Sequence, residues 1–368
     1  MNEKKRVAVL FGGKSGEHEV SLMSARSILR EMDRNLWEAV SIGISKGGKW
    51  YWLEDPGPVL DAGRVLDGAG PEVLLRPGLG REAFAVFEGG RAYPLGIDVV
   101  FPILHGTNGE DGTVQGLLEL ADIPYVGAGV IGSAVGMDKV VSKKLFRQEG
   151  IPTPDFICVT RSELEKAPAQ VIERVERSVG YPCFVKPVAL GSSVGVNKAR
   201  DREGLKRALE EAALYDSRLI IEDAIEGIFE VECSVLGYLE PKASAVGEIV
   251  PSDEFYSYNA KYIDGKSIIN IPAPLPEDVS QKVREYALKA FRATGCVGMG
   301  RVDGFVRKSD YKIFISEINT IPGFTSISMY PKLWEYVGLS YPSLITELLR
   351  LGFEVYEDKK RNRTSYFD

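Results

Sequence analysis

The stretch from Gly298 to Met329 constrains the fold most, because it places polar side chains two residues apart within two apolar runs. Arg301 and Asp303 lie in the first run, and Glu317 and Asn319 lie in the second. In an extended strand, residues two apart point to the same face, so each pair shares one side of a sheet. The polar residues between the two runs predict a hairpin connection.

The length of this connection decides whether the two pairs meet. A three-residue loop over Lys308–Asp310 would set Arg301 opposite Glu317 and leave Asp303 on the same face. A two-residue turn would put the two acids on opposite faces, so we expect an odd loop or a β-bulge. The same register predicts an apolar core face on the other side of the hairpin, made of Val302, Val306, Phe314 and Ile318.

The side chains on the polar face suggest a chemistry. Asp303, Glu317 and Asn319 offer the oxygen ligands that Mg²⁺ prefers. Arg301 beside them suits a phosphate or a carboxylate. A surface hairpin held by a salt bridge is the alternative, and the hairpin by itself does not separate the two.

The size and charge of the chain exclude several classes of protein. With 368 residues the chain exceeds one compact core, so two or three domains are expected. A net charge of −7 argues against non-specific binding to nucleic acid. No apolar run approaches the roughly 20 residues that span a membrane. The N-terminus lacks the long apolar stretch of a signal peptide, so no membrane partner is expected.

The cysteines and histidines narrow the chemistry further. Four scattered cysteines with no CxxC pair are typical of reduced, buried thiols in a cytoplasmic protein. With only two histidines, His18 and His105, a histidine-rich zinc site is nearly excluded.

The first part of the chain alternates strands, glycine-rich turns and helices. Residues 6–11 form an apolar strand that enters a glycine turn, and the helix after it begins near Glu17. The continuous apolar run 97–104 predicts a strand of a parallel sheet that is buried on both sides. His105 follows directly, at the start of a glycine loop. It either meets a ligand there or holds backbone groups of the loop.

The middle of the chain has the features of a phosphate site. A strand ending at Lys186 runs into the glycine-serine loop 187–195, whose backbone N–H groups can wrap a polyphosphate and whose flexibility suits a lid. Another strand over 219–225 ends in acids. Residues 251–276 show little periodicity, which suggests a binding loop or a lid. Single helices are expected over 137–150 and 164–179.

Several of these signals occur in one order that resembles a known family. They are HEVSL at 18–22, GSSVG at 191–195, GRVD at 300–303 and EINTIPGFT at 317–325. Together they resemble the D-alanine–D-alanine ligases of the ATP-grasp superfamily, over almost the whole chain.

The resemblance implies an α/β fold, with α+β character in the ATP-binding part. It implies three domains: an N-terminal parallel-sheet domain over 1–133, a central ATP-grasp domain with the GSSVG lid over 134–225, and a C-terminal ATP-grasp domain over 226–368. ATP would lie between two sheets, with both amino-acid sites at the domain junctions.

The resemblance also assigns residues by position. The ATP site would comprise Lys139, Lys186, Ser192, Ser193, Glu222, Asp223, Ile225, Glu230, Lys261 and Asn319. Matching Glu230 requires a one-residue insertion near Ile228. Two Mg²⁺ ions, for which Mn²⁺ could substitute, would be held by Asp303, Glu317 and Asn319. The catalytic set would be Glu17, Ser192, Tyr262, Gly300, Arg301 and Ser328. Substrate contacts would come from Glu17, His105, Arg301, Ser328 and Met329.

The implied reaction joins two D-alanine molecules at the expense of ATP, for peptidoglycan precursor synthesis. Glu17 would hold the ammonium of the first amino acid, Ser192 and Tyr262 would fasten the lid to Glu17, and Arg301 with the Gly300 N–H would stabilise an oxyanion. K⁺ as an activator, a homodimer and a cytoplasmic location follow from the same resemblance. Two alternatives stay open: a D-alanine–D-lactate ligase, against which Tyr262 argues, and an ATP-binding protein without ligase activity.

Overall fold

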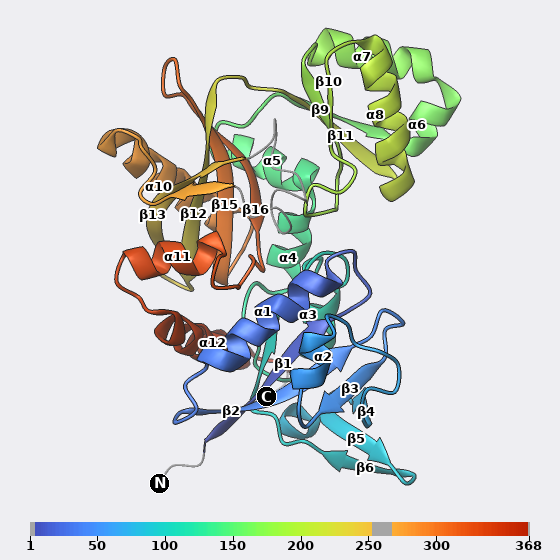
Figure 1. Ribbon diagram of the computed structural model, residues 1–368, viewed down its shortest axis with the longest axis vertical. Helices are drawn as coiled ribbons and strands as arrows, with labels where there is room; N and C mark the ends of the chain where they lie inside the picture. Colours follow the sequence, from blue (N-terminus) through green and yellow to red (C-terminus); the bar gives the residue numbers. More distant parts are fainter. Residues whose placement is uncertain (1–3, 252–266, 367–368) are drawn as a thin grey trace.

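Three β-sheets and the helices that cover them make up the computed structural model, which describes residues 4–251 and 267–366 (Figure 1). Lys261 and Tyr262 therefore lie outside the described residues. Within the described part of the chain, no helix is both long and apolar enough to span a bilayer. The four cysteines are free thiols; Cys183, Cys233 and Cys296 are buried as predicted, whereas Cys158 is only half-buried.

The first sheet is parallel only at one end. Its seven strands run in the order β6-β5-β4-β3-β2-β1-β7, with β1 parallel to β2 and β7 and the other neighbours antiparallel. The bounds are β1 Lys5–Gly12, β2 Trp37–Ile44, β3 Trp50–Leu53, β4 Glu72–Leu75, β5 Phe84–Glu88, β6 Arg91–Pro94 and β7 Val99–Pro102. The predicted parallel sheet is thus a mixed sheet with an antiparallel extension.

Strand β1 is buried on both faces, as its continuous apolar run predicts. On one side Val7, Val9 and Phe11 share a core with helices α1 and α12. On the other side Ala8 and Leu10 pack with α3. The helices of this part are α1 His18–Glu31, α2 Gly57–Asp61, a short 3₁₀ turn η1 Gly80–Glu82, α3 Thr113–Ala121 and, from the far end of the chain, α12 Tyr341–Lys360.

Two helices lead from the first sheet toward the second. The helix expected over 137–150 is confirmed as α5 Lys139–Gln148, but its start is wrong, because Met137 ends a separate helix, α4 Val130–Met137. Asp138 between them is extended, and its carboxylate accepts the N–H groups of Val140 and Val141 at 3.0 and 2.9 Å. An aspartate that caps the following helix in this way ends the preceding one. Lys139 consequently lies in the first turn of α5.

The second sheet is antiparallel, in the order β10-β9-β11-β8, and helices cover one of its faces (Figure 1). Its elements are β8 Phe156–Thr160, α6 Arg161–Lys166, α7 Pro168–Ser178, β9 Cys183–Pro187, β10 Asn197–Ala199, α8 Arg202–Tyr215 and β11 Arg218–Asp223. The predicted helix over 164–179 divides at Pro168, which lacks an N–H and begins α7.

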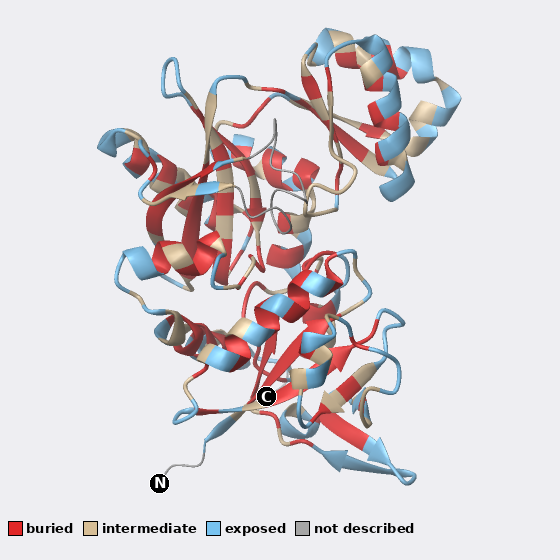
Figure 2. Cartoon of the chain, in the orientation of Figure 1, coloured by how far each residue is buried: buried red, intermediate tan, exposed pale blue. Residues whose placement is uncertain are grey.

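The third sheet carries the hairpin on which the sequence analysis centred. Its strand order is β14-β13-β12-β15-β16, and all neighbours are antiparallel. The bounds are β12 Ile228–Gly237, β13 Lys242–Val250, β14 Ile268–Asn270, α10 Glu277–Ala293, β15 Gly298–Arg307, β16 Ile313–Asn319 and α11 Met329–Tyr336. Buried residues run along these strands and the helix faces that pack on them (Figure 2).

A β-bulge sets the register of this hairpin. Gly304 pairs with Ile315, but the next pair is Asp303 with Glu317, so Ser316 is the extra residue on β16. The predicted three-residue loop is wrong, because Arg307 N–H donates to Lys312 O at 2.9 Å and closes a longer connection. The β-bulge, which was the other predicted possibility, keeps Asp303, Glu317 and Asn319 on one face of the sheet.

Because of the bulge, two predicted cross-strand pairings are wrong. Arg301 pairs with Asn319, not with Glu317. Phe314 pairs with Phe305 on the polar face, because the extra residue reverses the alternation of β16. The core face therefore consists of Val302, Val306, Ile313, Ile315 and Ile318.

We expect Phe291→Ala in α10 to lower the free energy of unfolding by about 3–5 kcal/mol, the usual cost of truncating a buried aromatic side chain. Phe291 is fully buried, and its ring lies 3.1 Å from the position a Cβ would take on Gly300. Urea unfolding followed by far-UV circular dichroism measures the change. Leu214→Ala is the matched control, because Leu214 is 78% exposed. Equal midpoints for the two variants would contradict this packing.

Candidate active site

A cavity of about 500 Å³ lies between the second and third sheets. Charged side chains from both sheets line it: Lys186, Lys198, Glu222, Asp223, Glu226, Glu230, Glu248, Asp303, Lys308 and Glu317. Ser193 and Ile225, both predicted for an ATP site, also line it. The structure therefore brings many of the predicted ATP-site residues together around one cavity, whose shape the sequence could not define.

A buried carboxylate in the lining of the cavity joins two lysines. Lys186 Nζ lies 2.7 Å from Glu222 Oε2, and Lys143 Nζ lies 3.1 Å from Glu222 Oε1. Burial alone would raise the pKa of Glu222, but the two lysines overcome it and lower this pKa to about 2. Burial works against the charge of Lys186 as well, yet Glu222 and Glu317 raise its pKa. Glu222 thus keeps Lys186 charged within the protein.

Lys143 was missed by the sequence analysis. It lies on α5, one turn after Lys139, and its side chain is fully buried. Burial lowers the pKa of Lys143, against the opposing effect of Glu222. Its spacing to Lys139 places both lysines on one face of a helix, which is the signal that could have revealed it.

The polar face of the β15–β16 hairpin carries a compact charge cluster. Arg301 donates to both oxygens of Asp303, at 2.7 and 2.6 Å, and its Nε lies 2.9 Å from Glu232 Oε2. Asn319 Nδ2 donates to Asp303 Oδ2 at 2.8 Å. Glu232, on the neighbouring strand opposite Asp303, was not predicted, because an acid alternating on a strand is usually a solvated one.

Lys139 extends this cluster toward the glycine-serine loop. Its Nζ lies 3.3 Å from Glu317 Oε2 and donates to Leu190 O at 2.6 Å. Lys139 is mostly buried, and Leu190 directly precedes the GSSVG segment. One lysine therefore connects α5, the third sheet and the loop.

Glu17 forms the other end of the site. Ser192 Oγ donates to its carboxylate, which joins the N-terminal part of the chain to the GSSVG loop. The Cβ that a side chain would add at Gly106 would lie 2.6 Å from Glu17 Oε2, and the one at Gly191 would lie 3.0 Å from it. A side chain at Gly106 would therefore displace this carboxylate, and one at Gly191 would touch it closely.

His105 is engaged by the protein at both ring nitrogens. Its Nδ1 lies 3.0 Å from Ile321 O, and its Nε2 lies 3.1 Å from Ser24 Oγ. A carbonyl only accepts, so Nδ1 carries the proton and Nε2 accepts from the serine. Burial lowers the pKa of His105, which keeps the ring neutral. Of the two predicted roles, holding backbone groups describes these contacts.

Of the residues after β16, Ser328 belongs to the predicted site, whereas the Met329 side chain lies in an apolar core. Ser328 precedes α11, and its Oγ accepts the Thr325 N–H at 3.0 Å. The Met329 side chain is buried in an apolar cluster with Leu333 and Ala245. Any contact of Met329 with a ligand therefore falls to its backbone. Gly300 faces Phe291 on the core side of β15.

The predicted metal ligands share one face and present only hard donors. Over residues 4–251 and 267–366, no group of three or more His, Cys, Asp and Glu side chains could hold a metal. The candidate ligands for a metal are therefore two carboxylates and one amide oxygen, from Asp303, Glu317 and Asn319. Oxygen donors in this number fit Mg²⁺, which completes its octahedron with water and phosphate oxygens.

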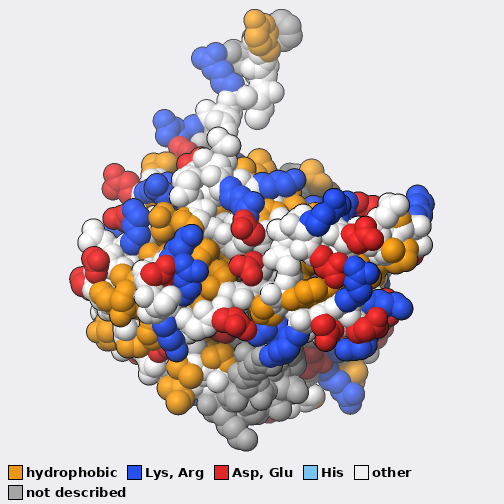
Figure 3. All heavy atoms as spheres, turned by 90° about the horizontal axis from the view of Figure 1, so that it is seen from above, with side chains coloured by type: hydrophobic (Ala, Val, Ile, Leu, Met, Phe, Trp, Pro, Cys, Tyr) orange, Lys and Arg blue, Asp and Glu red, His pale blue; other side chains and the backbone are white. Residues whose placement is uncertain are grey.

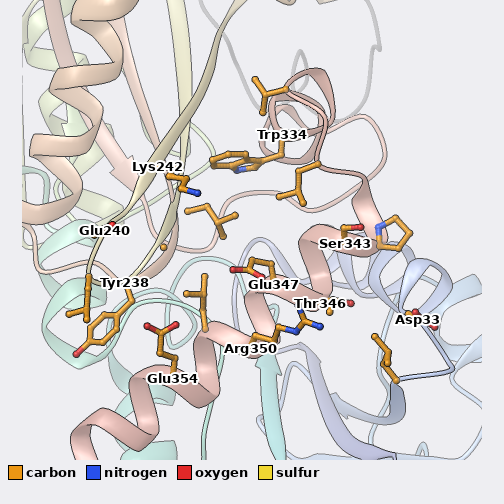
Figure 4. A pocket seen from close by; sticks show the side chains of 18 residues that line it. Asp33, Tyr238, Glu240, Lys242, Trp334, Ser343, Thr346, Glu347, Arg350 and Glu354 are labelled. Atoms are coloured by element: carbon orange, nitrogen blue, oxygen red, sulfur yellow. The ribbon is translucent and has the colours of Figure 1, made fainter.

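A second cavity, of about 850 Å³, lies away from these groups between α12, α11 and the β12–β13 hairpin. Figure 4 shows Glu347, Arg350 and Glu354 of α12 facing it from below and Trp334 from above. None of the predicted site residues lines it. We therefore place the candidate site at the smaller cavity, where the buried charges converge. The surface seen from above carries interspersed acidic and basic side chains (Figure 3).

Comparisons with known proteins agree with this site and fold. The family model for the D-ala D-ala ligase N-terminus matches residues 6–128, and the model for the D-ala D-ala ligase C-terminus matches residues 145–350. A D-alanine–D-alanine ligase of Thermoanaerobacter sp. (strain X514) is 50% identical over 98% of this chain and 99% of its own length. The ligase of Acetivibrio thermocellus is 48% identical over 97% of this chain and 98% of its own length.

Solved structures give the same result. The D-alanine-D-alanine ligase of Coxiella burnetii superposes with a TM-score of 0.85 at 37% identity, covering 98% of this chain and 97% of that one. The VanG D-Ala:D-Ser ligase of Enterococcus faecalis gives a TM-score of 0.84 at 37% identity, covering 95% of this chain and 100% of that one. The fold is thus the ATP-grasp fold of an ATP-dependent ligase. The chain belongs to the D-alanine–D-alanine ligase family, which confirms the resemblance read from its motifs.

We expect Lys143→Met to destabilise the protein by about 3–5 kcal/mol at pH 7, the usual cost of removing one partner of a buried ion pair. The folded-state pKa of Glu222 is about 2, against an ordinary 4.5, so its charge stabilises the fold above pH 4.5. That stabilisation is lost as the pH falls toward 2, and the difference between variant and wild type should shrink over this range. Urea unfolding at several pH values measures it.

Lys144→Met is the matched control, because the neighbouring Lys144 is exposed. A Lys143→Met protein as stable as this control at pH 7 would contradict the role of the buried pair.

Proposed function

We propose that this protein joins two D-alanine molecules into D-alanyl-D-alanine, with ATP converted to ADP and phosphate through a D-alanyl phosphate. The observation that carries the proposal is the row of charges from Lys186 and Lys139 through Glu317 and Asp303 to Arg301. Such a row suits a phosphoryl group in transfer, for which positioning and electrostatics supply most of the catalysis.

The first step transfers the γ-phosphoryl group to a carboxylate. A carboxylate oxygen of the first D-alanine attacks phosphorus, the bond to the bridging oxygen breaks, and ADP leaves. Lys139 and Lys186 spread the charge of the transferring group, and Glu222 holds Lys186 in its charged form. Mg²⁺ held by Asp303, Glu317 and Asn319, with Mn²⁺ as a substitute, would neutralise further charge on the phosphate oxygens.

The second step forms the peptide bond. The amine of the second D-alanine attacks the acyl phosphate carbon, an oxyanion forms, and phosphate leaves as the carbonyl is restored. Arg301 and the Gly300 N–H stabilise that oxyanion. Ser328 and the Met329 backbone receive the carboxylate of the second amino acid, while Glu17 and His105 lie around the first one.

Closure of the glycine-serine loop keeps water from the acyl phosphate. The hydrogen bond from Ser192 to Glu17 supports this assignment, because it fastens the loop beside the first amino acid. Lys261 and Tyr262 lie outside the described residues, and their roles in ATP binding and closure stay predictions. ATP binding by Ser193, Asp223, Ile225 and Glu230 rests on their place around the cavity.

The organisation of the protein is part of the proposal. Domains over 1–133, 134–225 and 226–368 are supported by the three separate sheets, although α12 packs on the first sheet and Phe146 of α5 packs in the core of the third. A homodimer, a cytoplasmic location, activation by K⁺ and a role in peptidoglycan precursor synthesis come from the family.

The identity of the second substrate distinguishes a D-alanine–D-alanine ligase from ligases that make other products. D-lactate would give a depsipeptide, and D-serine is favoured as a further candidate by the similarity to the VanG ligase. A protein that only binds ATP would lack turnover with any of them.

Purified protein with ATP, Mg²⁺, K⁺ and D-alanine should release ADP in proportion to D-alanine, and mass spectrometry should find D-alanyl-D-alanine. Equimolar D-lactate or D-serine near neutral pH should leave this dipeptide as the main product. ADP release that does not depend on D-alanine, or a depsipeptide or D-alanyl-D-serine as the main product, would overturn the assignment.

Arg301→Ala should lower kcat by roughly 10²–10³, because it removes a donor to the oxyanion. ATP binding, measured by calorimetry, should persist. Arg307→Ala is the matched control, since Arg307 lies at the exposed end of the same strand and pairs with Asp310 at 2.5 Å. Activity near that of the control would remove Arg301 from its assigned role.

A further inference from the structure

Glu110 is a buried acid for which the reaction described above has no use. It lies in the glycine loop after β7, its exposed fraction is 9%, and the sequence analysis did not select it. Its Oε2 accepts the Gly106 N–H at 2.7 Å, and its Oε1 accepts the Ile321 N–H at 3.3 Å. Glu110 therefore connects the loop of the first sheet to the segment that follows β16.

A second buried carboxylate lies on the other side of Gly106. Glu17 Oε2 would be only 2.6 Å from a Cβ on Gly106, while the N–H of the same glycine donates to Glu110. Glu17 is also buried, with an exposed fraction of 8%, so water can do little to stabilise a negative charge on either acid. Two buried carboxylates that both lie beside one glycine do not both ionise easily, and one of them takes up a proton.

The groups that face Glu110 identify it as the one that takes up the proton. Burial is the largest influence and the charge of Glu17 the second; together they raise the pKa of Glu110 to about 8, against the two N–H donors and Arg301. Within residues 4–251 and 267–366, His105 also lies beside Glu17; burial lowers its pKa and keeps it neutral, so it has no proton to release near pH 7.

We propose that Glu110 holds a proton in the substrate-free enzyme and releases it when the ammonium group of the first amino acid binds at Glu17. The inference rests on the proposed function, because it takes Glu17 as the ammonium site. The O–H bond of the Glu110 carboxyl breaks, its electron pair stays on the carboxylate, and the proton passes to the buffer. The ammonium brings one positive charge to the two acids and the departing proton removes one, so the charge at Glu17 and Glu110 stays constant, while the substrate carboxylate adds one negative charge to the site as a whole.

Release of this proton also strengthens the contact between the two loops. An ionised Glu110 accepts the Gly106 and Ile321 N–H groups in charge-assisted hydrogen bonds, which are roughly twice as strong as neutral ones. Ile321 follows Asn319 by two residues and is held from its other side by His105. Binding of the ammonium therefore tightens the segment after β16 against the first sheet, before ATP is used.

Titration calorimetry with D-alanine and the full-length protein tests this directly. The binding heat is measured at pH 7 in two buffers with different ionisation enthalpies, and the difference gives the number of protons released. A pKa of about 8 leaves roughly nine-tenths of Glu110 protonated at pH 7, so we expect a measurable release of up to about 0.9 proton per D-alanine bound. The number should fall as the pH rises past 8. A binding heat that does not depend on the buffer would overturn the proposal.

Variants assign the proton to its residue. Glu110→Gln should bind D-alanine with a release near zero, whereas Glu72→Gln, an exposed acid of β4, should release the proton as the wild type does. An undiminished release from Glu110→Gln would contradict the assignment. The new side chain in Glu110→Gln would turn an NH₂ group toward a backbone N–H, and if this variant does not fold, the pH series on the wild type decides.

The same experiment separates the two proposals. Saturable binding of D-alanine without proton release refutes the role of Glu110 and leaves the ligase assignment intact. No binding of D-alanine at any concentration refutes Glu17 as the ammonium site, and the role of Glu110 with it.

Discussion

The extra residue at Ser316 holds Asp303 opposite Glu317, and the geometry of the site depends on that pairing. Without the bulge, the alternation of β16 would turn Glu317 and Asn319 toward the apolar core, where Val302 and Ile318 now pack. The same hairpin thus supplies a dry face to α10 and a charged face to the cavity. A position that carries chemistry is fixed here by a local irregularity of the backbone, as is common for bulges near active sites.

Charge balance then determines which side chains can be buried beside this face. Each acid of the cluster has a cation within 3.3 Å: Glu222 has Lys143 and Lys186, Glu317 has Lys139, and Asp303 has Arg301. Such pairs are costly to desolvate and costly to break. In the proposed reaction Lys139, Lys186 and Arg301 of these pairs face phosphate and carboxylate oxygens, which is the organisation that electrostatic catalysis needs. Stability and function therefore draw on the same side chains.

From the sequence, residue periodicity and the ends of strands predicted which polar side chains share a face and which family the chain resembles. The two-residue spacing of Arg301 and Asp303 gave their shared face, and the motifs gave the family. The register was not predictable, because a bulge and a longer connection changed the partners while keeping the face. The break at Asp138 was hidden because helix-forming residues lie on both sides of it.

Lys143 and Glu110 were missed for another reason. Each looks like an ordinary surface charge in the sequence, and only the packing of distant segments buries it. Glu110 lies 211 residues before its partner Ile321, and Lys143 meets Glu222 from a different element. The spacing of Lys143 to Lys139 indicates a shared helix face, but burial of a charge by distant segments leaves no local pattern, so the burial of both residues became visible only in the structure.

The central claim is that the charged face activates a carboxylate by phosphorylation. D-alanine labelled with ¹⁸O in its carboxylate tests this most directly, with mass analysis of the phosphate that the reaction releases. Transfer to a carboxylate oxygen predicts one ¹⁸O atom in each phosphate, because the acyl phosphate breaks at its carbonyl carbon. Phosphate that carries no label from the amino acid would contradict the account.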